Sequence, residues 1–336
     1  MLYIVIGYLW LSIWLYLLFG GADFGAGILE LFTRRNNRSR TIRTTYRAMG
    51  PIWEANHMWL IIAIVILFVG FSNIYATVSL CLHIPLAIML LGIIARGTAF
   101  SFRHYDAIVD DMQIVYNRIF TWSSFITPFF LGIIAGSVVS GKINVHAQRF
   151  LQAYVWGWLG WFDIAVGLFT VSICAFLAAV FLIGETDGEK DRRRFIAKAK
   201  SANVCAVFSG GLVFLAAWAE GVPLTHWLFG NAVSLGAVIA ALASLMLLWY
   251  LLFRGKTKVA LRLLAGFQVT MILLAATYPH FPRIVLLQGG AYLSLTENYG
   301  DEKTIQVLAW ALMLGSLFIL PALFYLIYSF KKPATP

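Results

Sequence analysis

The chain has 336 residues, of which 61% are hydrophobic and only 12% are charged, and its mean hydropathy is +0.82. Because soluble globular proteins carry about 25% charged residues, this composition excludes an ordinary soluble enzyme and predicts an all-α polytopic membrane protein. The net charge of +10 does not indicate a nucleic-acid partner, since the basic residues gather in alternate loops between apolar segments.

Nine apolar segments are long enough to cross a bilayer as helices, which takes about 20 residues each. In chain order they are 3–22, 55–71, 75–95, 119–140, 164–184, 201–219, 232–253, 263–282 and 304–330. None contains Asp, Glu, Lys or Arg within these ranges. Ser72 and Asn73 are expected to divide the long run 55–95 into the second and third spans.

The basic residues predict the orientation of these spans. The loops after spans one, three, five and seven, together with the C-terminal tail, hold 21 of the 25 Lys and Arg residues. Because cytoplasmic loops are the basic ones, the N-terminus is expected outside and the C-terminus in the cytoplasm. The opposite side holds only Lys142, Arg149, Arg283 and Lys303.

The spans are expected to form two four-helix bundles and one peripheral helix. The first bundle covers residues 1–140 and carries the polar cluster described next, and the second covers 164–282. An outer loop at 141–163 joins them, in which 144–161 resembles an interfacial helix with tryptophans at headgroup depth. Residues 283–336 hold another outer loop, the ninth helix and a cytoplasmic tail.

Four ionisable side chains lie in or beside the first three spans, at Asp23, Glu54, His57 and Arg96. The predicted topology puts all four in the cytoplasmic third of three consecutive helices, which short connections make neighbours. Such residues usually face a bundle interior and mark ion or proton pathways. Arg96 could pair with either acid merely to lock the bundle. Alternatively, the acids pass protons inward from the cytoplasm, since burial in low dielectric lets a carboxylate hold a proton near neutral pH.

The remaining histidines give no metal-site pattern. His83, His226 and His280 stand alone, without a second imidazole at i+4. They are expected to be packing or interfacial residues. Pro279 and Pro282 are expected to end the eighth span.

Three stretches on the first three spans carry a family resemblance, and they are GGADFGAGILELFTRR (20–35), GPIWEANHMWLI (50–61) and ARGTAFSFR (95–103). In this order they resemble subunit II of the cytochrome bd-type quinol oxidases. The resemblance implies a haem-free subunit bound to a larger subunit I, which holds haems b and d and the quinol and oxygen sites. It further implies a complex in the prokaryotic cytoplasmic (inner) membrane, with membrane lipids around it and room for a small single-helix subunit. That complex oxidises quinol, reduces oxygen to water with cytoplasmic protons and builds a proton gradient without pumping.

The resemblance also implies roles for individual residues. It places Asp23, Glu54, His57 and Arg96 in proton transfer, with Arg96 tuning the acids. The residues that support the motifs are Trp53, Asn56, Trp59 and Arg103. Many relatives carry an acid where this chain has Ser101, which puts any role of that position in doubt. No cofactor or metal is expected on this chain, although a structural quinone or lipid could take the place that corresponds to the partner's haems.

Two other functions remain open at this point. A proton-coupled secondary transporter would show broken helices and a midplane binding site, whereas the polar cluster here is predicted near the cytoplasmic edge. A purely structural scaffold subunit would use the buried ions only for packing. Loss of Glu54 would then lower the amount of complex and leave its specific activity unchanged.

Overall fold

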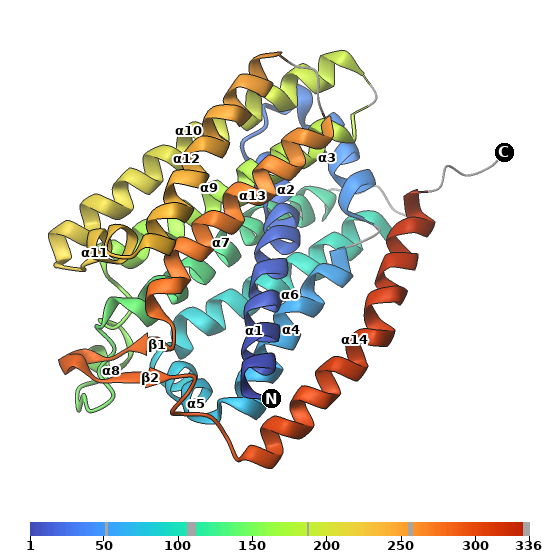
Figure 1. Cartoon of the computed structure of the whole chain (residues 1–336). Helices are drawn as coiled ribbons and strands as arrows, with labels where there is room; N and C mark the ends of the chain where they lie inside the picture. The colour runs from blue at the N-terminus through green and yellow to red at the C-terminus, as the bar shows by residue number, and fades with distance from the viewer. Residues whose placement is uncertain (51–52, 106–111, 187, 255–257, 332–336) are drawn as a thin grey trace.

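A computed structural model of the chain describes residues 1–50, 53–105, 112–186, 188–254 and 258–331 (Figure 1). Helices dominate it, as a bilayer requires, because a helix satisfies its own backbone hydrogen bonds where no water is present. Within these residues, eight helices are long and apolar enough to cross a membrane, and the count is up to nine if one bent pair forms a single span. The prediction of an all-α polytopic membrane protein is confirmed; the predicted orientation stays a prediction.

The first span is longer than the apolar run that predicts it. It comprises α1 (Leu2–Leu15), a π-helical turn η1 (Tyr16–Gly20) and α2 (Gly21–Leu31), which together form one helix from residue 2 to residue 31. The basic helix α3 (Arg35–Met49) follows. The stretch GAGILELF therefore continues the helix beyond Asp23.

The second and third spans differ from the prediction. Helix α4 (Trp53–Gly70) stops before Phe71, because the φ of −134° and ψ of 52° at Phe71 lie outside the helical region. Helix α5 (Ser72–Cys81) then turns away by 114°, and α6 (His83–Tyr105) forms the next long helix. The predicted third span 75–95 is therefore wrong at its start. The break at Ser72 and Asn73 was predicted correctly, but the third long helix begins only at His83, because α5 forms a separate short helix before it.

The remaining long helices overlap the predicted spans, but several begin earlier. They are α7 (Met112–Ser140), α9 (Trp161–Gly184), α10 (Glu189–Glu220), α12 (Ala232–Arg254), α13 (Lys258–Thr277) and α14 (Glu302–Lys331). Helix α10 includes the basic segment 190–200 that was predicted to be a loop. Helix α13 ends just before the short 3-10 turn η2 (Tyr278–His280), as Pro279 and Pro282 predict.

Helix α9 lies at the centre of the packing and contacts α2, α7, α10 and α13. Helix α14 runs along the side of the molecule, against α1 and α4 (Figure 1). Because α9 contacts helices from both proposed bundles, the two halves share one continuous interior. The division into two four-helix bundles stays a prediction.

Short elements gather at one end of the molecule. They are α8 (Phe150–Tyr154), α11 (Leu224–Phe229), η3 (Gln288–Gly290) and a hairpin of β1 (Arg283–Leu286) and β2 (Tyr292–Ser294). Helix α3 lies at the opposite end from α8 and the hairpin (Figure 1). The hairpin was not predicted, and the helix within 144–161 is limited to the five residues of α8.

Candidate functional site

A buried ion pair joins the first span to the third. The carboxylate of Asp23 on α2 lies 2.7 Å from Nη2 of Arg96 on α6, and each side chain is 1% exposed. The same Nη2 donates to the Asp23 carbonyl at 3.1 Å, while Nε donates to Oγ of Ser124 on α7 at 3.0 Å. We call Asp23, Arg96 and Ser124 the Asp23 layer.

A second buried ion pair repeats this arrangement. Oε2 of Glu30 on α2 lies 2.8 Å from Nη1 of Arg103 on α6, with side-chain exposures of 0% and 3%. The same Nη1 donates to Oδ1 of Asn117 on α7 at 3.3 Å. Glu30, Arg103 and Asn117 form the Glu30 layer.

The two layers are related by a seven-residue spacing on all three helices. Seven residues make almost two full turns of an α-helix, so both members on each helix lie on one face, about 10 Å apart along the axis. Phe120 lies between the layers, with its ring centroid 5.0 Å from the Arg96 guanidinium carbon and 4.1 Å from that of Arg103. These contacts are cation–π interactions.

Glycines allow the first span to approach its neighbours closely enough to form these layers. A Cβ at Gly25 would overlap the carbonyl of Cys174 on α9, and a Cβ at Gly27 would overlap the side chain of Ser124. Ser124 is the acceptor for Arg96, so the glycines of GGADFGAG help place the ion pair. The π-helical turn η1 ends three residues before Asp23, and such turns are frequent at functional sites.

His57 lies beside the Asp23 layer. Its ring is 5.7 Å from that of Phe24 and 6.1 Å from that of Tyr16, measured between centroids. Its Nδ1 is buried without a hydrogen-bond partner. Phe24 in turn lies 5.0 Å from the Arg96 guanidinium carbon. The structure therefore brings Asp23, His57 and Arg96 together around one phenylalanine.

The motif-supporting residues of the second span pack nearby. Trp59 is buried in a cluster with Tyr16 and Phe24, and Trp53 lies 5.1 Å from Phe100 between ring centroids. Asn56 is buried. The backbone of Glu54 belongs to α4, but its side chain lies outside the described part of the structure, so its place in the cluster remains a prediction.

Sequence reasoning missed Glu30 and gave Arg103 only a supporting place. The apolar window for the first span stopped at residue 22, which left Glu30 in the adjoining segment. The sequence nevertheless contained a signal for both residues. Glu30 follows Asp23 by seven positions, and Arg103 follows Arg96 by the same number.

Another polar cluster lies at the other ends of the helices. Glu220, the last residue of α10, accepts the backbone N–H groups of Trp161 and Phe162 at 2.8 and 3.1 Å and pairs with Lys142. Asp163 is fully buried, 3.9 Å from the same lysine. Glu220 is thus partly shielded from solvent and stabilises the start of α9.

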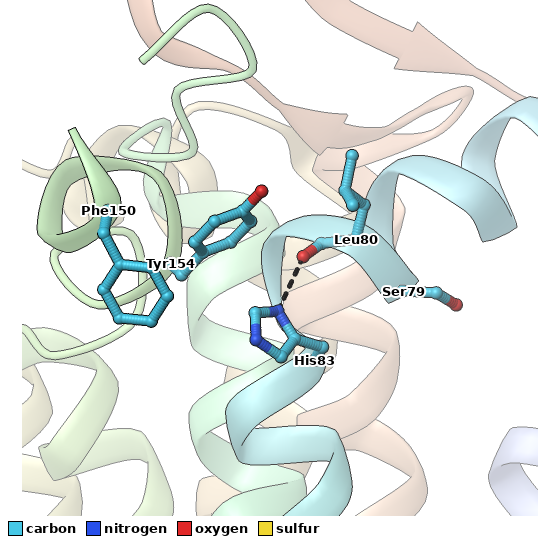
Figure 2. A pocket seen from close by; sticks show the side chains of 5 residues that line it. All are labelled: Ser79, Leu80, His83, Phe150 and Tyr154. Carbon is cyan, nitrogen blue, oxygen red and sulfur yellow. Dashed lines mark hydrogen bonds between the residues drawn. The ribbon is translucent and has the colours of Figure 1, made fainter. Parts of the chain in front are cut away.

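Two cavities flank these regions. One of about 570 Å³ adjoins the Glu30 layer and is lined by Thr33, Arg38, Ser39, Ile42, Ile114, Asn117 and Arg118. The other, of about 340 Å³, lies between α5, α6 and α8 (Figure 2). There His83 donates from Nδ1 to the Leu80 carbonyl at 2.9 Å and packs against Tyr154. His83 thus makes packing contacts, as predicted.

Comparison with known proteins agrees with the motifs on the first three spans. The family described as cytochrome bd terminal oxidase subunit II matches residues 1–330. The cytochrome bd ubiquinol oxidase subunit 2 of Bacillus subtilis (strain 168) is 26% identical over 330 residues, covering 93% of this chain and 90% of that protein. The cytochrome bd-I ubiquinol oxidase subunit 2 of Escherichia coli (strain K12) is 24% identical over 324 residues, covering 86% of this chain and 83% of that protein.

The fold is also shared with a solved structure. A chain in the structure of bd oxidase from Geobacillus thermodenitrificans matches with a TM-score of 0.77 at 20% identity, covering 98% of this chain and 99% of that chain. Because the family match spans almost the whole sequence, this chain belongs to the cytochrome bd terminal oxidase subunit II family and is a membrane-spanning component of a respiratory oxidoreductase.

Proposed function

We propose that this chain is the haem-free subunit of a quinol:oxygen oxidoreductase in the bacterial cytoplasmic membrane, bound to a larger subunit I. It stabilises that subunit and delivers cytoplasmic protons toward the site where oxygen is reduced to water. Asp23 and Glu54 carry the protons, His57 assists, and Arg96 adjusts the charge around them. Quinol and oxygen are substrates of the complex.

The observation that carries the proton-transfer proposal is the buried pair of Asp23 and Arg96. A carboxylate enclosed by α2, α6 and α7 is costly to desolvate, and a hydrophobic pair of similar size would often be at least as stable. Ionisable groups inside membrane helices are accordingly functional by default. The unpartnered Nδ1 of His57 beside the same layer supplies a further group that can bind a proton.

We further propose that haems b and d reside on the partner subunit. The sequence supports this proposal, because His83, His226 and His280 stand alone and offer no paired imidazole ligands. His280 is buried and packs against Trp227, with 4.4 Å between the ring centroids. A structural quinone or lipid on this subunit remains part of the proposal.

The test is quinol-driven oxygen consumption, expressed per haem, in the purified complex carrying Asp23→Asn or Glu54→Gln. Each change removes a titratable proton and preserves the side-chain size. We expect turnover per haem to fall by at least about tenfold, because general acid–base steps contribute about 10²–10⁴-fold. Glu189→Gln is the matched control, since Glu189 is exposed on α10 and forms a solvent-exposed pair with its neighbour Arg193.

Two outcomes would count against the proposal. Unchanged turnover per haem with less complex recovered would assign both acids to the scaffold role. Purified complex without haem bands in its visible spectrum would instead favour a transporter.

A further inference from the structure

We propose that Glu30 is a second proton-carrying carboxylate and that the cavity beside the Glu30 layer is its water-filled entrance. This inference rests on the proposed function of the Asp23 layer. Glu30 would take a proton from water in the cavity and release it toward Asp23. The two acids would thus act in sequence along one face of α2.

The first argument is the state of the Glu30 carboxylate itself. Its Oε2 pairs with Arg103, whereas its Oε1 is buried and has no hydrogen-bond partner. Burial favours the neutral acid and the neighbouring guanidinium favours the carboxylate, so these two influences oppose each other. A carboxyl group with one oxygen unpartnered also has a site at which a proton can be added while Oε2 keeps its hydrogen bond to Arg103.

The second argument is access from the cavity. Asn117 lines the cavity and also accepts a hydrogen bond from Arg103, the partner of Glu30. Thr33, one turn after Glu30 on the chain, lines it as well. A volume of about 570 Å³ accommodates several waters, since each occupies about 30 Å³ in the liquid. The basic helix α3, which follows the first span, contributes Arg38, Ser39 and Ile42 to the cavity wall. The cavity therefore lies on the side predicted to be cytoplasmic.

The third argument is a set of buried polar atoms without hydrogen-bond partners, which belong to both layers. Besides Glu30 Oε1, the buried atoms without a hydrogen-bond partner include Nε and Nη2 of Arg103, Nη1 of Arg96 and Oδ2 of Asp23. Arg38 Nε, on a residue that lines the cavity, belongs to the same set. Buried polar groups are normally satisfied, by ordered water where the protein offers no partner. These atoms therefore mark binding sites for waters from the cavity to Asp23.

The proton step balances without any further reactant. A water in the cavity donates a proton to Oε1 of Glu30 and regains one from the cytoplasmic solution, so that Glu30 becomes a neutral carboxylic acid and no hydroxide is left behind. Glu30 then passes that proton through water to Oδ2 of Asp23 and returns to the carboxylate. Throughout the step, Arg103 keeps its positive charge and its hydrogen bond to Asn117.

The experiment compares Glu30→Gln, Glu30→Asp, Asn117→Leu and Asp23→Asn in the assembled complex, with Glu189→Gln as the exposed control. Oxygen consumption per haem and proton uptake from the medium are measured with quinol, and haem content reports assembly. We expect Glu30→Gln to lower both rates at least tenfold with haem content unchanged. Glu30→Asp should retain at least half of the turnover, and Asn117→Leu should lower it because leucine fills the cavity wall.

Each contrary result has one meaning. Turnover of Glu30→Gln within twofold of the parent, with Asp23→Asn impaired, overturns the role of Glu30 and leaves the proposed function standing. Full turnover in both Glu30→Gln and Asp23→Asn overturns the role of Glu30 and the proposed function of the Asp23 layer. Reduced haem content in Glu30→Gln with unchanged turnover per haem assigns Glu30 to packing alone. If Glu30→Gln does not assemble, Asn117→Leu decides, and full turnover in that variant overturns the proposal.

Discussion

Asp23 and Arg96 form an ion pair of 2.7 Å in which neither side chain is more than 1% exposed. They lie 73 positions apart in the chain, and the same separation relates Glu30 to Arg103. The equal separation follows from the seven-residue repeat on both helices, which run in the same direction. One packing arrangement of α2 against α6 therefore creates both pairs.

Removing one member of the Asp23 pair should cost more than removing both. Asp23→Leu or Arg96→Met alone leaves an uncompensated buried charge, which costs about 3–5 kcal/mol of stability. The double variant should recover a substantial part of that loss, since no charge remains buried. Thermal unfolding midpoints of the purified complex measure the effect. Strictly additive shifts would show that the two side chains do not depend on each other.

Gly27→Val should destabilise the subunit by about 1–3 kcal/mol through overpacking. A side chain at this position meets Ser124 on α7, which accepts the hydrogen bond from Arg96. Gly211→Ala on α10 is the control, because a Cβ there has no atom within 4 Å. Recovery of complex and its unfolding midpoint are the measurements. Equal behaviour of the two variants would contradict the close approach of α2 to α7.

Glu220→Ala should lower stability by about 1.5–3 kcal/mol, the net contribution of a hydrogen bond to a charged group. The change removes the acceptor for the N–H groups of Trp161 and Phe162 at the start of α9. It also removes a negative charge from a helix N-terminus, where such a charge is favourable. The exposed Glu297→Ala is the comparison, and its unfolding midpoint should not change.

His57→Phe should separate packing from proton chemistry. Phenylalanine preserves the ring contacts with Tyr16 and Phe24 but cannot bind a proton. We expect near-normal haem content and a near-normal unfolding midpoint. Oxygen consumption per haem should fall about two- to tenfold, because a residue that only assists proton transfer contributes less than a full general acid–base step. Undiminished turnover would assign His57 to packing only.

Much of the site was accessible from sequence because its charged residues interrupt apolar runs. Asp23, His57 and Arg96 were predicted to be neighbours, and they surround Phe24 in the structure. Glu30 was missed because a hydropathy window ends where polar residues begin, although the helix itself continues. The break at Ser72 and Asn73 was predicted, but the short helix α5 after it was merged with the third span, because α5 and α6 belong to one apolar run.

The sequence by itself determined the membrane class, the approximate places of most spans and the family, because a bilayer demands long apolar segments and the motifs are contiguous. Tertiary structure alone decided which acid pairs with which arginine. It also placed Ser124 and Asn117 as the third members of the two layers and put a cavity beside Glu30. These features depend on the rotation and close approach of α2, α6 and α7, which side-chain packing sets between residues far apart in the chain.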